Sequence, residues 1–124
     1  MNPVKTHKDL DLWKASMDFV VDLYKTTEML PASEKFGLIS QMRRAGVSIP
    51  SNIAEGAARQ LPKEFRRFLF IALGSLAELE TQLEIVFRLG FLSTIEKEIE
   101  TLTRIRKMLI NLIHAIQKKI QEGQ

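Results

Sequence analysis

The clearest fold signal in the sequence is residues 65–86, FRRFLFIALGSLAELETQLEIV. Apolar residues recur there at alternating steps of four and three, namely Phe65, Leu69, Ala72, Leu76, Leu79, Leu83 and Val86. This spacing places them on one stripe of an α-helix that packs nearly parallel to its neighbours. Pro62 suits the first turn of a helix, and Gly90 can adopt the left-handed conformation that ends one. The stretch therefore predicts a helix from about Pro62 to Leu89.

Three more periodic runs surround this helix. The first lies before Pro31, with its predicted core face at Trp13, Met17, Val20 and Tyr24. The second follows Ser33, a residue type that caps helices, and its predicted core face is Phe36, Ile39, Met42, Gly46, Ile49, Ile53 and Ala57. The last begins at Ser93–Glu96, typical of a capping box, and continues through Ile95, Ile99, Leu102, Ile105, Leu109, Leu112, Ile116 and Ile120.

The connections between these runs are short, which makes consecutive helices antiparallel neighbours. The sequence contains no internal repeat and no visible second domain. We therefore expect residues 1–124 to form one all-α domain, an antiparallel up-down-up-down four-helix bundle.

Pro50 interrupts the second run without breaking its periodicity. The core positions Gly46, Ile49 and Ile53 continue past it, so the chain is expected to stay helical on both sides, with a kink or local unwinding. Gly46 would leave room for that adjustment, and the hydroxyls of Ser48 and Ser51 can satisfy freed backbone groups.

Composition excludes several classes of protein. Cysteine is absent from the 124 residues, so disulfides and thiolate metal sites are impossible. The charged N-terminus does not resemble a signal peptide, and no uncharged run reaches the roughly 20 residues of a membrane span. A soluble cytoplasmic protein without membrane partners is expected. The net charge is only +3, but residues 35–67 hold seven basic and two acidic side chains, and residues 101–124 hold five and one.

Three segments resemble the bacterial four-helix bundle protein family, whose first described members are encoded by intervening sequences within 23S rRNA genes. They are residues 9–27, DLDLWKASMDFVVDLYKTT, residues 37–59, GLISQMRRAGVSIPSNIAEGAAR, and residues 63–92, KEFRRFLFIALGSLAELETQLEIVFRLGFL. The resemblance implies a closed bundle in a ring-like homo-oligomer, a pentamer. It also implies kinship with the accessory variability determinant protein of diversity-generating retroelements, a basic barrel that assists a reverse transcriptase and contacts nucleic acid. Leu61-Pro62 departs from the serine-type cap expected at that turn.

A block of cations is the first candidate site. Guanidinium forks suit phosphates, and a ring would repeat each charge around its axis. Exposed aromatic side chains that would stack bases are not evident, because the phenylalanines lie on core stripes. Recognition would therefore act on the nucleic-acid backbone. The candidate nucleic-acid-binding residues are Arg43, Arg44, Arg59, Lys63, Arg66 and Arg67.

Two polar stripes on the second and third helices are the next candidates. They could hydrogen-bond within the bundle, line a subunit interface or form a site. An interface is favoured, because polar groups set the register and partner choice that a ring needs. The predicted oligomer-interface residues are Ser48, Asn52, Glu55, Ser75, Glu78 and Gln82.

Catalysis and metal binding have little support. Carboxylate-bridged metal sites in helical bundles use Glu-x-x-His, and Asn111 stands three residues before His114. No histidine accompanies a candidate nucleophile in the resembling motifs. We expect no catalytic residue, metal or cofactor. The predicted function is a non-enzymatic oligomeric accessory protein that binds RNA or DNA, and the alternative is a scaffold that docks an acidic partner protein.

Overall fold

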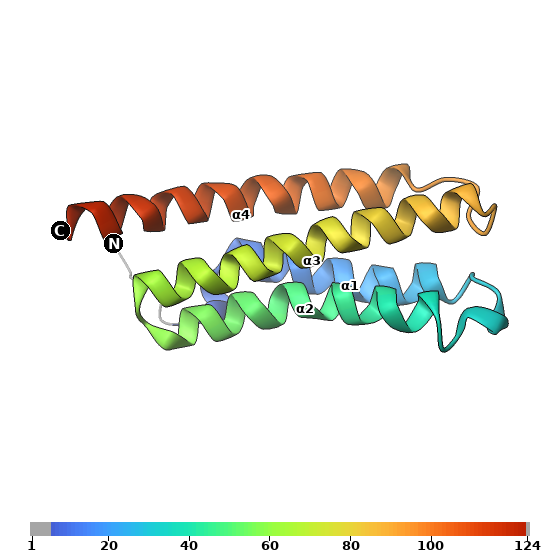
Figure 1. Ribbon diagram of the computed structural model, residues 1–124, viewed down its shortest axis with the longest axis horizontal. Coiled ribbons are helices and arrows are strands. Elements are labelled where there is room, and N and C mark those ends of the chain that lie inside the picture. The colour runs from blue at the N-terminus through green and yellow to red at the C-terminus, as the bar shows by residue number, and fades with distance from the viewer. Residues whose placement is uncertain (1–5, 124) are drawn as a thin grey trace.

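The computed structural model describes residues 6–123, and its regular elements are all helical (Figure 1). Two short 3-10 helices, η1 (His7–Asp9) and η2 (Ala32–Glu34), precede the first two long helices. The long helices are α1 (Asp11–Thr27), α2 (Leu38–Arg59), α3 (Pro62–Arg88) and α4 (Glu96–Glu122).

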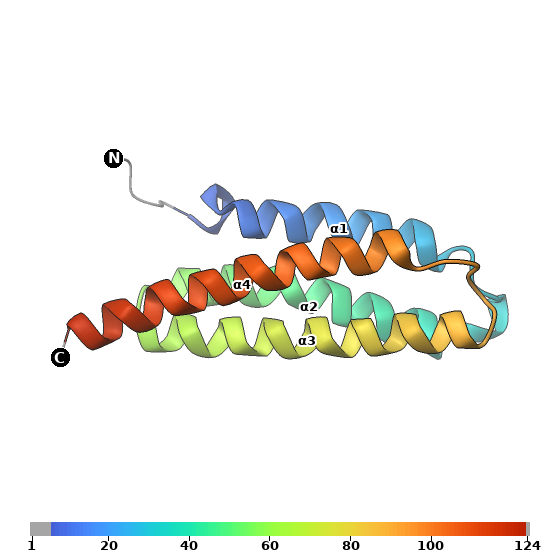
Figure 2. The ribbon, with the colours of Figure 1, turned by 90° about the horizontal axis from the view of Figure 1, so that it is seen from above.

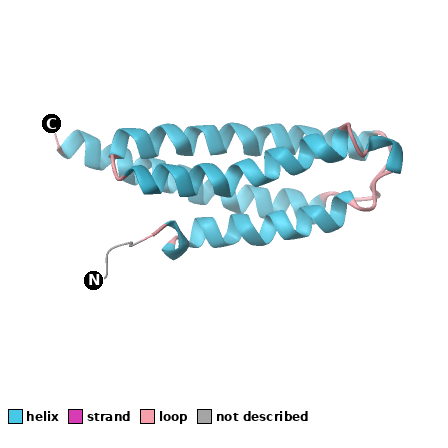
Figure 3. Cartoon of the chain, turned by 90° about the horizontal axis from the view of Figure 1, so that it is seen from below, coloured by secondary structure: helices cyan, strands magenta, loops and turns pink. Residues whose placement is uncertain are grey.

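The four long helices lie along one axis of the molecule. Figures 1 and 2 show the chain reversing direction at each connection, and α1 packs against both α2 and α4. Figure 3 shows only helices and loops within residues 6–123. The predicted all-α, four-helix fold is confirmed.

The predicted seam of α3 forms the centre of the core. Leu69, Ala72, Leu76, Leu79, Leu83 and Val86 have no exposed surface. The helix ends in a Schellman motif, in which Gly90 has φ +80° and the N–H groups of Gly90 and Phe91 donate to the carbonyls of Phe87 and Val86. Both the seam and the glycine stop are therefore as the sequence predicts.

The predicted core face of α1 is only partly correct, because Trp13 packs against the core whereas Met17 and Tyr24 are exposed. Met17 and Tyr24 are 39% and 41% exposed, and the apolar residues buried on α1 are Leu12, Phe19 and Leu23. The buried face also contains Ser16 and Thr27, whose hydroxyls donate to carbonyls one turn earlier at 2.8 and 2.9 Å. Hydroxyls satisfied in this way can be buried. The apolar residues alone therefore predict a stripe of α1 that lies beside the buried one.

The predicted starts of α2 and α4 are also wrong. Ser33 lies inside η2, and Phe36, assigned to the core, is 91% exposed before α2 begins. At α4, the N–H of Glu96 donates to Thr94 Oγ1 at 3.2 Å, and no side chain bonds at the cap position. A serine or threonine hydroxyl caps a helix only at the residue where that helix begins. Both α2 and α4 begin later in the chain than predicted.

Helix α2 continues through Pro50 as predicted, and its two glycines mark close contacts with its neighbours. A β-carbon at Gly46 would lie 2.5 Å from Leu23 Cδ2, so this space is filled by α1 and is not left free for the proline. A β-carbon at Gly56 would lie 2.8 Å from Phe68 Cβ and 3.3 Å from the carbonyl oxygen of Phe65. Helix α3 therefore packs directly on the backbone of α2 near their connection.

We predict that Gly56→Ala lowers the free energy of unfolding by about 2 kcal/mol, because the added methyl group forces α3 away from α2. The matched control is Gly74→Ala, where a β-carbon meets nothing within 4 Å. That change should raise the free energy of unfolding by about 0.5–1 kcal/mol through its helix propensity. Urea unfolding followed by circular dichroism measures both, and equal effects of the two changes would contradict the close approach.

Candidate nucleic-acid interface

The connection between α2 and α3 is a tight turn at one end of the bundle. Helix α2 closes at Gln60, which adopts the left-handed conformation with φ 60° and ψ 15°. Leu61 follows in an extended conformation, and Pro62 starts α3 without any side-chain cap. Two residues thus reverse the chain, which brings Arg59 to the same end of the bundle as Lys63.

The C-terminal part of α4 reaches the same end. Figures 1 and 2 show α4 extending past the α2–α3 connection. Lys119 lines one surface hollow together with Lys63, Pro62 and Leu61. We call Arg59, Lys63, Arg66, Arg67 and Lys119 the basic end. Lys119 is not among the cations predicted from sequence, although the excess of positive charge in residues 101–124 was a signal for it.

The cations of the basic end differ in their partners. Arg59 pairs with Glu55 at 3.3 Å and Arg67 with Glu64 at 3.1 Å, and all four side chains are substantially exposed. None of the acidic side chains that the structure describes forms an ion pair with Lys63, Arg66 or Lys119. These three cations are therefore free to meet an external anion.

The Arg67–Glu64 pair is ionised at neutral pH. The hydrogen bond from Arg67 is the main cause that lowers the pKa of Glu64, and the same bond raises the pKa of Arg67. Because the pKa of Glu64 is lowered on folding, the pair stabilises the fold above pH 4.5 and loses this effect as the pH falls through the lower, folded value. Exposed pairs are weak, so a phosphate can compete for Arg67.

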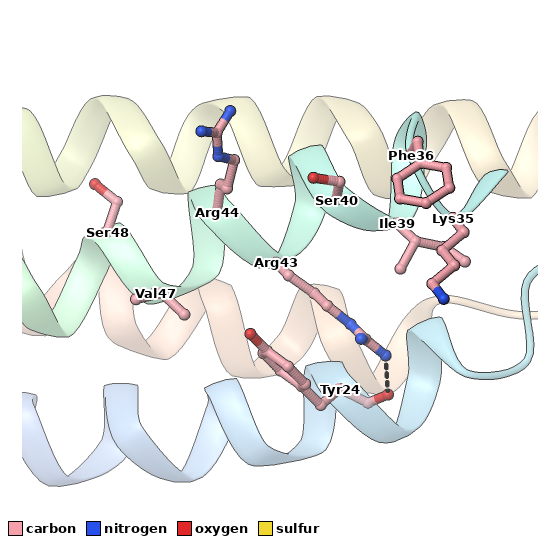
Figure 4. Close-up of a pocket in the computed structure, with 9 residues that line it drawn as sticks. All are labelled: Tyr24, Lys35, Phe36, Ile39, Ser40, Arg43, Arg44, Val47 and Ser48. Carbon is pink, nitrogen blue, oxygen red and sulfur yellow. Dashed lines mark hydrogen bonds between the residues drawn. The ribbon is translucent and has the colours of Figure 1, made fainter.

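Arg43 has a structural role and is not offered to an external anion. Its Nε donates to Thr27 Oγ1 at 2.9 Å, and its Nη2 bonds the carbonyl of Tyr24 and the carboxylate of Glu28. The guanidinium lies 4.3 Å from the centre of the Tyr24 ring. Figure 4 shows Arg43 pointing to Tyr24 on α1, while Arg44 points away from α1.

The six predicted cations therefore do not form one surface. Arg44 lies about 22 Å along α2 from Arg59, at 1.5 Å per residue. The structure gathers Arg59, Lys63, Arg66 and Arg67, separates Arg44 from them and uses Arg43 to hold α1 against α2.

The predicted interface residues lie mostly between α2 and α3. The hydroxyls of Ser48 and Ser75 are 2.8 Å apart, and Asn52 Nδ2 donates to Ser48 Oγ at 2.9 Å. Gln82 is buried, and its Nε2 donates to Glu78 Oε2 at 3.3 Å, while its Oε1 has no partner within the described chain. Hydrogen bonding within the bundle, the alternative that the sequence left open, accounts for these contacts. Glu55 and Glu78 are exposed, and a role of these residues between subunits stays a prediction.

Comparison with known proteins places this fold in a family. A family model described as 23S rRNA-intervening sequence protein matches residues 8–111. The chain belongs to this family. The resemblance seen in the sequence is thereby confirmed, while kinship with the retroelement accessory protein stays a prediction.

A solved structure agrees with the intervening-sequence family assignment. The crystal structure of a protein with unknown function from the S23 ribosomal protein family of Bacteroides thetaiotaomicron VPI-5482 is 30% identical, with a TM-score of 0.75. The alignment covers 83% of the present chain and 95% of that one. No curated protein matches the chain.

The described residues of this family member include neither a membrane-spanning helix nor a metal-binding cluster. Among the helices of residues 6–123, none combines the length and apolar character needed to cross a bilayer. The same residues contain no cluster of three histidine or carboxylate side chains arranged to hold a metal ion.

We predict that Arg43→Ala lowers the free energy of unfolding by about 2 kcal/mol, because it removes hydrogen bonds between α2 and the last turn of α1. The adjacent Arg44→Ala should stay within about 0.5 kcal/mol of the wild type, since Arg44 is exposed. Urea unfolding measures both. A larger loss for Arg44→Ala than for Arg43→Ala would contradict the assigned roles.

Proposed function

We propose that the protein is a non-enzymatic accessory protein that binds nucleic acid through its basic end. The observation that carries this proposal is that Lys63 of α3 and Lys119 of α4 line one hollow, with Arg66 one turn further along α3. These three cations have no acidic partner among the side chains that the structure describes. The family description, which names 23S rRNA, favours RNA as the first ligand to test. We further propose a cytoplasmic location, with which the absence of cysteine is compatible.

Recognition would act on the phosphate backbone. Lysine and arginine neutralise phosphates and release counterions, so affinity depends steeply on salt and little on sequence. Arg59 and Arg67 lie over the Phe68 ring at 5.3 and 4.5 Å, which holds their guanidinium groups beside the free cations. A phosphate that displaces Glu55 from Arg59, or Glu64 from Arg67, would gain a hydrogen-bonded contact with that guanidinium group.

The contacts of the hydroxyl groups support a non-enzymatic role. The hydroxyls of Ser48 and Ser75 bond each other between α2 and α3, and Ser48 also accepts a hydrogen bond from Asn52. None of these groups is a general base at neutral pH. The arrangement therefore serves packing and does not activate a nucleophile.

Salt titration of binding tests the proposal. With a short RNA duplex, the logarithm of the association constant should fall linearly with the logarithm of salt concentration, and Lys63→Ala and Arg66→Ala should each make the slope shallower by about 1. Arg44→Ala is the control, because it removes the same charge far from the basic end and should leave the slope unchanged. A DNA duplex of the same sequence measures the preference between the two nucleic acids.

Two results would contradict nucleic-acid binding at this end. The first is no binding of either duplex at low salt, and the second is an equal effect of Arg44→Ala and Arg66→Ala on the slope.

We also propose that the antiparallel bundle assembles as a ring-like homo-oligomer, a pentamer. A hollow of about 590 Å³ between α1 and α2 exposes apolar side chains of Tyr24, Phe36 and Val47, with Lys35 and Arg44 at its edge (Figure 4). Three exposed apolar side chains grouped around one hollow favour a contact with another chain. The same observation supports the second candidate function, a scaffold that docks an acidic partner protein.

Mass measurement in solution tests the assembly. Light scattering should give a particle of five chains, and Phe36→Ser should reduce its mass while leaving the helix content of each chain unchanged, because Phe36 lies outside the core. A monomeric wild-type protein would exclude the ring. A monomer that still binds RNA at the basic end would leave the nucleic-acid proposal standing.

A further inference from the structure

A second hollow, of about 360 Å³, opens at the basic end between α4 and the α2–α3 turn. Its walls are largely apolar and include Leu61, Pro62, Phe65 and Ile116. Two polar side chains, Gln60 and Lys119, also line it. The volume lies within the range of about 300–1,000 Å³ that is usual for small-molecule sites.

Gln60 is an unexpected residue at this turn. Among the described residues it is the only one other than glycine with a positive φ. Glycine adopts this conformation without strain and is the usual residue after a helix. Gln60 uses its N–H to bond the carbonyl of Ala57, which glycine would do equally well. The turn itself therefore does not require the glutamine side chain.

The Gln60 amide is available to a ligand at this hollow. The side chain is exposed at the hollow and forms no hydrogen bond within residues 6–123. An amide offers both a donor and an acceptor, which matches the edge of a nucleobase. The ring of Phe65 and the apolar surfaces of Leu61 and Pro62 can cover the faces of such a base. Lys119 at the rim, with Lys63 in the adjoining hollow, suits the flanking phosphates.

We propose that this hollow binds one unpaired nucleobase of an RNA strand, with Gln60 bonding its edge. The inference rests on the proposed function and adds a structural preference to it, namely RNA in which a nucleotide is bulged out of the helix. Charge complementarity selects this occupant, because Lys119 lines both hollows and Lys63 lines the adjoining one, while the one carboxylate of the two hollows, Glu64, is paired with Arg67. An apolar side chain of a partner protein would use neither the amide nor the lysines.

Two RNA hairpins that differ by a single bulged nucleotide test the proposal, with affinity measured by fluorescence anisotropy. The wild-type protein should bind the bulged hairpin about tenfold more tightly than the fully paired one. Gln60→Gly should abolish most of this preference and leave the affinity for the paired hairpin unchanged. The same substitution should raise the Tm by about 3 °C, because glycine relieves the positive φ.

Gln60→Asn is the matched control, since asparagine keeps an amide and tolerates the left-handed conformation. It should retain a larger part of the preference than glycine does. Loss of bulge affinity together with a gain in stability is a combination that a purely structural role of Gln60 does not produce.

Equal wild-type affinity for the two hairpins would overturn this inference and leave backbone binding intact. An undiminished bulge preference in Gln60→Gly would also overturn it. Failure of both hairpins to bind at low salt would overturn the proposed function itself, so the two ideas fail in different ways.

Discussion

At Gly56 the backbone of α2 approaches α3 so closely that a β-carbon would overlap Phe65 and Phe68. Nearer the middle of the same two helices, the hydroxyls of Ser48 and Ser75 meet in a hydrogen bond. Two such points on rigid helices permit a single register, because a slip of one residue would separate the serines and force a side chain against a phenylalanine ring. The register in turn decides which residues surround the α2–α3 turn. The position of the basic end thus follows from packing in the core.

The charge of a segment is a poor guide to the cations that it exposes. Arg43 and Arg44 are adjacent in sequence, but successive residues point about 100° apart around a helix. One guanidinium therefore packs into the last turn of α1, while the other faces solvent. At the basic end, Glu55 and Glu64 neutralise two of the arginines. The positive charge that residues 35–67 present to a partner is consequently smaller than the number of their basic side chains indicates, and it is confined to a shorter part of the surface.

The features that were predictable from sequence are those set by local chemistry. The leucine seam of α3, the glycine stop at Gly90 and the continuity of α2 through Pro50 all follow from spacing and backbone preference. The face of α1 did not follow, because Ser16 and Thr27 are buried by hydrogen bonds to the preceding turn that no apolar pattern records. Lys119 belongs to the basic end only because of the tertiary structure. Helix α4 must fold back along the bundle before its C-terminal turns lie beside Pro62. The role of Arg43 depends likewise on a contact between two helices.

The motif SIPSNIAEG, which carries much of the family resemblance, is explained here by packing. Pro50 is buried, Ser48 and Asn52 bond within the bundle, and Gly56 admits α3. A segment whose side chains are occupied in this way maintains the fold and has few groups left for a ligand. The three residues after α2 differ from it, because Gln60 holds a strained conformation and Leu61 and Pro62 supply no cap. Backbone strain and exposed apolar surface are features of binding sites. The function that we propose for this protein is therefore placed at the turn, beside the motif rather than in it.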